Sequence, residues 1–142
     1  MSKGGNEAVS ELSIMREVHN LKQLSHEHIV SVMDVIDVVD ATYIVMQRID
    51  GPELTDFIEM QPLRRIAAPV ARVFFSHILS ALRHAHTRGL IHCDVKPQNV
   101  RLNAACDRAV LTDWGLARRV GALTEAVTCG TPAYASPEQL TG

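Results

Sequence analysis

Hydrophobic residues recur at helical spacing near the start of the chain and again in its middle. The first predicted helix covers residues 7–24, because an apolar residue returns every three positions along it. The second covers residues 69–88, since Pro69 suits a first helical position and Gly89 suits the residue after a C-terminus. Its expected buried face comprises Val70, Val73, Phe74, His77, Ile78, Ala81, Leu82 and Ala85.

Two runs dense in valine and isoleucine lie between these helices. They cover residues 29–39 and 42–47, and β-branched residues favour strands. The short break at Asp40 and Ala41 predicts that the two strands form a hairpin.

Shorter elements complete the pattern. Asp50, Gly51 and Pro52 interrupt the chain, and Pro52 is placed to be the first residue of a short helix that ends near Met60. Further short strands are expected over residues 100–102 and 109–112. A helix with strands comes first, and helices with a long loop follow. The sequence therefore predicts an α+β fold of two lobes, divided near residues 47–51.

Composition narrows the possible classes of protein. The 142 residues suffice for one domain, and 46% hydrophobic with 21% charged residues is typical of a globular chain. The net charge of −2 gives no electrostatic reason to expect nucleic acid or an anionic membrane as a partner. No apolar run approaches the length that spans a bilayer. Three cysteines without a C-x-x-C pattern fit an intracellular, cytoplasmic or nuclear setting.

The most informative motif is the octapeptide His92-Cys-Asp-Val-Lys-Pro-Gln-Asn99, with Asp113-Trp-Gly following it. A lone aspartate in a loop usually serves a turn or a cap. Here Asp94 can accept a hydroxyl proton, and Lys96 can neutralise a moving phosphate. Asn99 and Asp113 offer the hard oxygen ligands that magnesium prefers. Their order and spacing favour phosphoryl transfer from a metal-bound nucleotide.

These motifs resemble the catalytic loop and D-F-G element of eukaryotic protein kinases, with Trp114 in place of Phe. Residues 130–138 resemble the end of the activation segment, with Ser136 where the family has Ala. That segment disfavours a small-molecule phosphotransferase. Lys96 together with Thr131 resembles the serine/threonine class. The resemblance covers residues 7–140 and implies a truncated, two-lobe, protein-kinase-like fold, with about 1–47 in the small lobe and 48–142 in the large lobe.

The resemblance implies transfer of the γ-phosphoryl group of ATP to serine and threonine hydroxyls of protein substrates, with Mg²⁺. Asp94 and Lys96 become the catalytic residues, and Asn99 and Asp113 hold the metal and the nucleotide phosphates. Glu17 corresponds to the helix glutamate that pairs with the ATP-binding lysine. At the nucleotide, the resemblance implies Met46 as gatekeeper, Gln47 and Ile49 at the adenine, and Glu53 at the ribose. A hydrophobic column that joins the lobes would consist of Leu21, Val32, His92 and Trp114. The phosphorylation candidates are Thr124 and Thr128.

Two residues depart from the family pattern. Cys93 stands where most kinases have an arginine that grips a phosphate on the activation loop, so regulation by loop phosphorylation is in doubt. Arg101 occupies a position that is usually apolar and lies under the adenine ring. Because a buried unpaired guanidinium is costly, either its side chain extends outward or the nucleotide pocket is impaired.

The resemblance is to the central part of a kinase domain. No Gly-rich loop or strand lysine precedes Glu17, and four residues follow Glu138. Two explanations stay open, a fragment of a longer kinase and a non-catalytic pseudokinase or binding module. We expect the chain alone to show little or no turnover and poor stability. The sequence does not indicate an oligomeric state.

Overall fold

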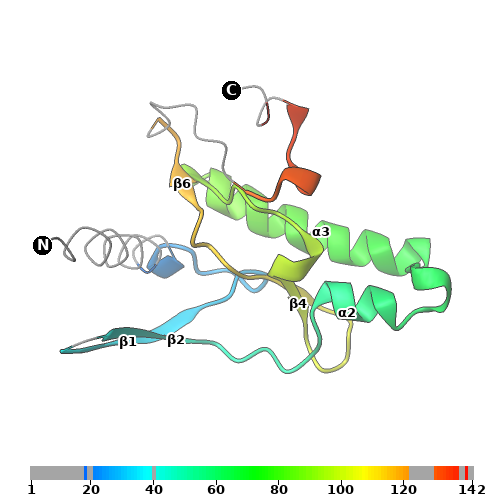
Figure 1. Cartoon of the computed structure of the whole chain (residues 1–142), viewed down its shortest axis with the longest axis horizontal. Coiled ribbons are helices and arrows are strands. Elements are labelled where there is room, and N and C mark those ends of the chain that lie inside the picture. The colour runs from blue at the N-terminus through cyan, green and yellow to red at the C-terminus, as the bar shows by residue number, and fades with distance from the viewer. Residues whose placement is uncertain (1–17, 19–20, 40, 122–129, 138–139, 141–142) are drawn as a thin grey trace, which may run out of the picture.

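The computed structural model describes residues 18, 21–39, 41–121, 130–137 and 140 (Figure 1). Helices and short antiparallel strand pairs alternate along it, which confirms the α+β class. The elements are β1 (Val32–Val38), β2 (Ala41–Met46), α2 (Leu54–Glu59), η1 (Pro62–Arg64), α3 (Ala68–His86), β3 (Leu90–Ile91), η2 (Pro97–Asn99), β4 (Val100–Leu102), β5 (Ala109–Leu111), β6 (Arg118–Arg119) and η3 (Pro132–Tyr134).

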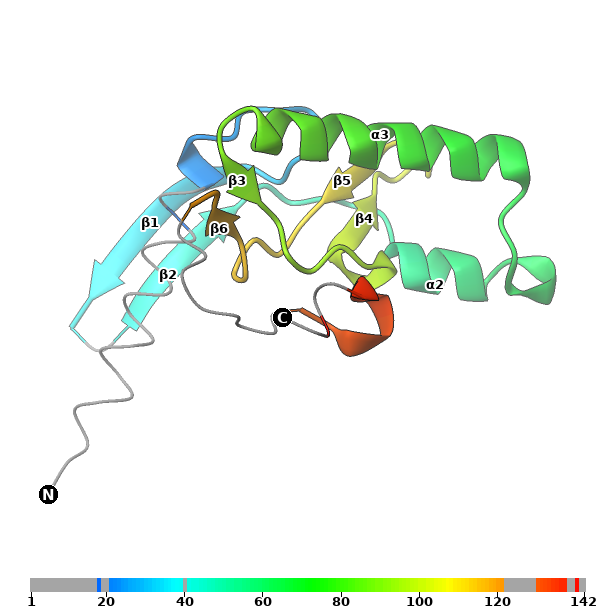
Figure 2. The ribbon, with the colours of Figure 1, turned by 90° about the horizontal axis from the view of Figure 1, so that it is seen from above.

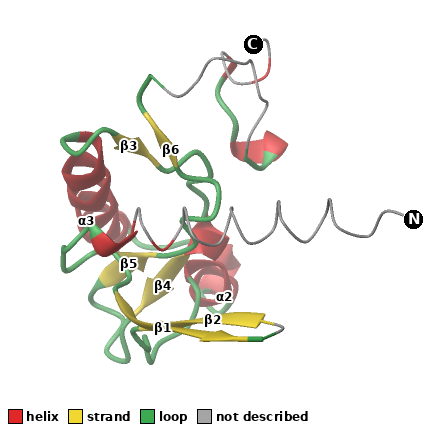
Figure 3. Cartoon of the chain, turned by 90° about the vertical axis from the view of Figure 1, so that its left-hand side faces the viewer, coloured by secondary structure: helices red, strands yellow, loops and turns green. Residues whose placement is uncertain are grey.

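Three two-stranded pairings organise these elements: β1 with β2, β3 with β6, and β4 with β5. The β3–β6 and β1–β2 pairs lie at opposite ends of the molecule, with β4 and β5 between them (Figure 3). No helix in the described ranges is long and apolar enough to cross a membrane.

The predicted hairpin is confirmed, since β1 and β2 pair antiparallel from Val38 opposite Ala41 to Val32 opposite Met46. The prediction that the first strand begins at residue 29 is wrong. Residues 29 and 30 pair with β5 instead, because the Val30 N–H donates to the Leu111 carbonyl at 3.0 Å. The chain thus runs beside β5 before it enters the hairpin.

The first predicted helix falls mostly outside the described residues, and Glu17, Thr124, Thr128 and Glu138 lie outside them too. Of its apolar stripe, Val18, Leu21 and Leu24 are described, and all three are buried. This burial agrees with the predicted apolar face.

Helix α3 matches its predicted extent within two residues, and Gly89 after it has φ +70°. Phe74, Ala81 and Ala85 are buried as expected. Val70 and Val73 are exposed, so that part of the predicted face is wrong. The first turns of α3 extend past β5 (Figure 2), so this part of the apolar face of α3 has no strand to pack against.

The short helix α2 begins two residues later than predicted, at Leu54. Pro52 is not in the helix, because its carbonyl accepts the Leu102 N–H at 2.9 Å. Glu53 is extended and forms an antiparallel bridge with Arg101. Residues 52 and 53 therefore run beside β4 before the helix can start.

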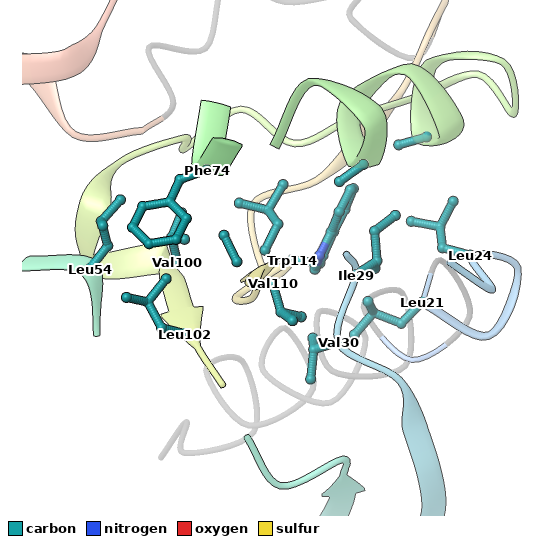
Figure 4. Close-up of a cluster of buried hydrophobic side chains, with 14 of the residues drawn as sticks. Leu21, Leu24, Ile29, Val30, Leu54, Phe74, Val100, Leu102, Val110 and Trp114 are labelled. Carbon is teal, nitrogen blue, oxygen red and sulfur yellow. The ribbon is translucent and has the colours of Figure 1, made fainter. Parts of the chain in front are cut away.

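The core lies between α3, the β4–β5 pair and the segment that precedes β1. Trp114 is fully buried near the centre of this cluster (Figure 4). Leu21 and His92 are also buried, and Val32 packs against the cluster. The rings of His92 and Trp114 meet edge to face at 4.6 Å. The predicted column is therefore part of the core.

The outer side of α3 is apolar and uncovered. Phe75 is 64% exposed, and Leu79 is 52% exposed. Met33 and Ile36 are likewise exposed on β1. The expectation of poor stability for the isolated chain rests on these faces and stays a prediction.

Candidate active site

The loop from His92 to Asn99 joins β3 to β4, and a buried histidine anchors its first turn. The His92 Nε2–H donates to the Thr112 carbonyl at 3.1 Å, and its Nδ1 accepts the Asp94 N–H at 3.2 Å. A ring that donates at one nitrogen and accepts at the other is neutral. Burial lowers the pKa of His92, which agrees with that state. Cys93, at φ +68°, turns the chain between them.

The Asp94 carboxylate accepts four hydrogen bonds. Its Oδ1 accepts the Thr131 N–H and the Thr131 hydroxyl, both at 2.8 Å. Its Oδ2 accepts from the Lys96 Nζ at 2.7 Å and the Asn99 Nδ2 at 3.0 Å. Burial raises the pKa of Asp94, but the hydrogen bonds from these three residues outweigh burial and lower the pKa to about 2. Asp94 is therefore ionised at neutral pH.

Thr131 joins the activation segment to the catalytic loop. Its hydroxyl accepts a hydrogen bond from the Lys96 Nζ at 2.7 Å while donating to Asp94. Gly130, at φ +100°, makes this approach possible, because a Cβ there would overlap the Cys93 carbonyl oxygen. Glycine is thus required directly before the threonine.

Asn99 and Asp113 lie at the same end of the β4–β5 pair. Val100 pairs with Leu111, and the Thr112 N–H donates to the Asn99 carbonyl at 2.8 Å. The Asn99 Nδ2 is committed to Asp94, so Oδ1 is the atom left to bind a cation. Asp113 has φ +55° and is exposed. One amide oxygen and one carboxylate suit Mg²⁺, which is commonly held by one or two protein ligands together with phosphates.

A pocket of about 530 Å³ adjoins these side chains. Its lining includes four of the predicted site residues and four more, namely Glu53, Lys96, Gln98, Asn99, Arg101, Thr112, Asp113 and Thr131. Asp94 is bonded to three of them. The sequence interpretation did not assign Gln98 or Thr112 to the site and used Thr131 only as a marker of class.

The residues expected at the adenine make backbone and core contacts in the described structure. Gln47 and Ile49 are absent from the pocket lining. The Gln47 N–H donates to the Ser31 carbonyl at 2.8 Å. Ile49 and Met46 pack against the hydrophobic core. Their contacts to a base stay predictions.

The Arg101 guanidinium is neither fully buried nor unpaired, and whether it impairs the nucleotide pocket stays a prediction. Its Nη2 donates to the Gly51 carbonyl at 3.1 Å, and its Nη1 lies 3.7 Å from the Glu53 Oε1. Each of the two charged side chains is 41% exposed. Arg101 therefore stays in the pocket wall, and Glu53, expected at the ribose, is its partner. The ribose contact stays a prediction.

The chain matches known protein kinases over most of its length. A family model described as protein kinase domain matches residues 1–142. The human serine/threonine-protein kinase ULK1 is 34% identical over 94% of this chain and 13% of its own length. CBL-interacting protein kinase 30 of Oryza sativa subsp. japonica is 37% identical over 89% of this chain and 27% of its own.

Maternal embryonic leucine zipper kinase of Danio rerio is 38% identical over 89% of this chain. It is matched over 19% of its own length, so the chain spans less than a third of each of these relatives. The family model nevertheless covers the whole chain, and the catalytic loop and its hydrogen-bonded threonine lie inside the match. The chain belongs to the protein kinase domain family.

Proposed function

We propose that this chain carries the catalytic centre of a serine/threonine kinase, which transfers the γ-phosphoryl group of ATP to protein hydroxyls. One observation carries the proposal. The ionised Asp94 carboxylate is bonded to Lys96, Asn99 and Thr131, and all three line one pocket with Asp113. A base, a cation and two oxygen ligands thus converge on the same space.

Asp94 orients the acceptor hydroxyl. Its four acceptor positions are all occupied, so an incoming hydroxyl replaces one donor, such as the Thr131 hydroxyl on Oδ1. With a pKa of about 2, Asp94 is a weak base toward an alcohol. It therefore takes the proton late, after bonding to phosphorus has made the alcohol oxygen acidic.

Lys96 and the two oxygen ligands act on the phosphate side. Lys96 is a mobile point charge that can leave Thr131 and follow the transferred group. Asn99 and Asp113 would hold Mg²⁺, which when bound would supply positive charge that offsets the charge of the nucleotide phosphates. Asp113, whose backbone is left-handed, is one of the residues that line the pocket.

The proposed acceptors are serine and threonine in proteins. The likeness to a human serine/threonine-protein kinase and the Lys96–Thr131 contact support this class. We also propose an intracellular protein, since Cys106 is a free thiol and the reaction draws on ATP.

The test has a binding arm and a transfer arm. Calorimetry measures ATP binding with and without Mg²⁺ for the unaltered chain and for Asp113→Asn. We expect binding that depends on Mg²⁺ and weakens at least tenfold in the variant. Labelled ATP is then offered with one peptide that carries Ser, Thr, Tyr or Ala at its centre.

We expect label on the Ser and Thr peptides only. Binding without transfer to any peptide would favour the non-catalytic binding module. Binding that Asp113→Asn leaves unchanged would contradict the proposed site.

A further inference from the structure

Four histidines that are far apart in the sequence meet where the segment before β1 crosses α3. His26 and His28 belong to that segment, and His77 and His84 belong to α3. The His28 and His77 rings are stacked at 4.1 Å, and the His26 and His84 rings are 4.8 Å apart. The His26 and His28 rings are 5.5 Å apart and complete a continuous row. Figure 2 shows the segment, in blue, beside the C-terminal half of α3.

Hydrogen bonds fix three of these rings in the neutral state. The His26 Nδ1 accepts the His28 N–H at 3.1 Å, and the His77 Nδ1 accepts the Ala109 N–H at 3.3 Å. The His84 Nδ1 accepts from the Arg88 guanidinium at 3.2 Å. Arginine and backbone N–H groups can only donate, so each Nδ1 must be unprotonated. A proton there would break the bond and place two donors face to face.

The fourth ring completes the contact with β5. The His28 Nδ1–H donates to the Ala109 carbonyl at 2.9 Å, and its Nε2 lies 3.8 Å from the Glu27 carboxylate. Ala109 therefore accepts from His28 and donates to His77, so one residue of β5 is held by both rings. Beside Ala109, backbone hydrogen bonds join the segment to β5. The Val30 N–H donates to the Leu111 carbonyl at 3.0 Å, and the Leu111 N–H donates to the His28 carbonyl at 2.8 Å.

The charges around the row disfavour added protons. Burial is the main cause that lowers the pKa of His26, His77 and His84. Among the neighbouring charges, cations outnumber acids. The facing charged groups are Glu27 beside the rings, Arg83 and Arg88 at the end of α3, and Asp107 and Arg108 before β5. The two acids oppose the shift without reversing it.

We propose that His26, His77 and His84, packed around His28, form an acid-sensitive junction, which holds residues 25–30 against α3 and β5 while these three rings are neutral and releases them when the three rings are protonated. The junction adjoins the site through β5, whose last residue, Leu111, is two positions before Asp113. Loosening it frees the β5 edge that the segment covers. This inference does not depend on nucleotide binding or on transfer.

The sign follows from linkage. Histidines with a folded-state pKa below 6.5 bind protons more readily once released. The junction is therefore fully stable above about pH 6.5, and it weakens as the pH falls below that value. For each such ring, the equilibrium constant for closing falls by up to about tenfold per pH unit.

Amide hydrogen exchange on the whole chain tests the proposal locally. The Val30 and Leu111 amides report the junction, and the Leu102 amide, bonded to Pro52, reports a contact outside it. The test variant is His26→Asn with His77→Asn, because an asparagine oxygen keeps an acceptor near each Nδ1 but does not titrate. The control is His86→Asn, an exposed histidine on the same helix.

From pH 7.5 to 5.5, after correction for intrinsic rates, we expect protection of Val30 and Leu111 to fall at least tenfold in the unaltered chain and in the control. Leu102 should change less than twofold. In the double variant, the logarithm of the protection factor of Val30 and Leu111 should fall by no more than half as much as in the unaltered chain. Equal falls in the double variant and the unaltered chain, or a parallel fall at Leu102, would overturn the junction.

A second measurement covers a double variant that does not fold. NMR titration of the ring protons in the unaltered chain should show His26, His77 and His84 protonating below pH 6.5, together with the loss of Val30 protection. Rings that titrate at their ordinary pKa while Val30 stays protected would overturn the proposal.

Discussion

Replacing Gly130 with alanine tests how the activation segment is held on the catalytic loop. Gly130 has φ +100°, and an added Cβ would overlap the backbone oxygen of Cys93. Gly89 at φ +70° and Gly121 at φ +85° have nothing within 4 Å of an added Cβ. Alanine in this left-handed region costs about 1–2 kcal/mol at any of the three positions. Gly89→Ala and Gly121→Ala thus reproduce the strain without the overlap.

The overlap at Gly130 is with a backbone atom, so it cannot be relieved by a side-chain rotation. The segment must move, and the two Thr131 hydrogen bonds to Asp94, each 2.8 Å long, are then lost. Burial raises the pKa of Asp94 and the four donors lower it, with a net fall from 3.8 to about 2. Losing two of them should raise that pKa by about one unit, which corresponds to about 1.4 kcal/mol less preference for the ionised form.

The assay is NMR titration of the aspartate carboxyl carbons from pH 7 downward, with the Asp94 signal assigned by its absence in Asp94→Asn. Fluorescence of Trp114, the single tryptophan, confirms that the chain stays folded. We expect half-ionisation of Asp94 near pH 2 in the unaltered chain and in both glycine controls. In Gly130→Ala we expect it near pH 3. An unchanged titration in Gly130→Ala, or an equal shift in the controls, would refute the reasoning.

Three further predictions follow from single contacts. In urea unfolding, Gly51→Ala should destabilise the chain by about 2 kcal/mol more than Gly89→Ala does. The reason is that a Cβ at position 51 would overlap carbonyl oxygens at the end of β4. Equal losses of stability in the two variants would contradict this. Lys96→Met should lower the rate of phosphoryl transfer about a hundredfold and change the Kd for ATP less than threefold, and an unchanged rate would count against its role. The lowered pKa of Asp94 contributes stability that is present above pH 3.8 and lost as the pH falls toward 2. Over that range, the free energy of unfolding should therefore fall less steeply in Asp94→Asn than in the unaltered chain, by up to about 1.4 kcal/mol per pH unit. Parallel profiles of stability against pH in the two proteins would disprove it.

Much of the fold could be predicted from local pattern. The hairpin, α3 and the separate strands β4 and β5 follow from residue type and punctuation, which act over short stretches of chain. The errors occur where a distant contact decides. Pro52 is kept out of α2 by Leu102, and Val70 is exposed because α3 extends past the strand it packs against. Neither contact leaves a periodic signal in the sequence.

The site divides in the same way. Asp94, Lys96 and Asn99 lie within six residues of one another, and Asp113 lies two residues after β5, which pairs with the strand that follows Asn99, so their spacing predicted that they meet. Thr131 bonds to Asp94 across 37 positions, and only the Gly-Thr pair before Pro132 could have indicated it.

The histidine row was missed for the same reason as Thr131. Its members come from two segments about 50 residues apart, and no metal-ligand spacing connects them. Only the crossing of the segment over α3 brings the rings together.

The most direct test of the central claim is single-turnover transfer from labelled ATP to the serine peptide, at saturating ATP and Mg²⁺, with Asp94→Asn beside the unaltered chain. The substitution keeps the shape of the side chain but removes its charge and most of its basicity. We predict at most slow transfer by the unaltered chain, as expected for the chain alone, and a loss of at least a hundredfold in Asp94→Asn, with ATP bound equally by both. Equal transfer by the two proteins would contradict the account, and ATP binding without any transfer would favour the non-catalytic binding module.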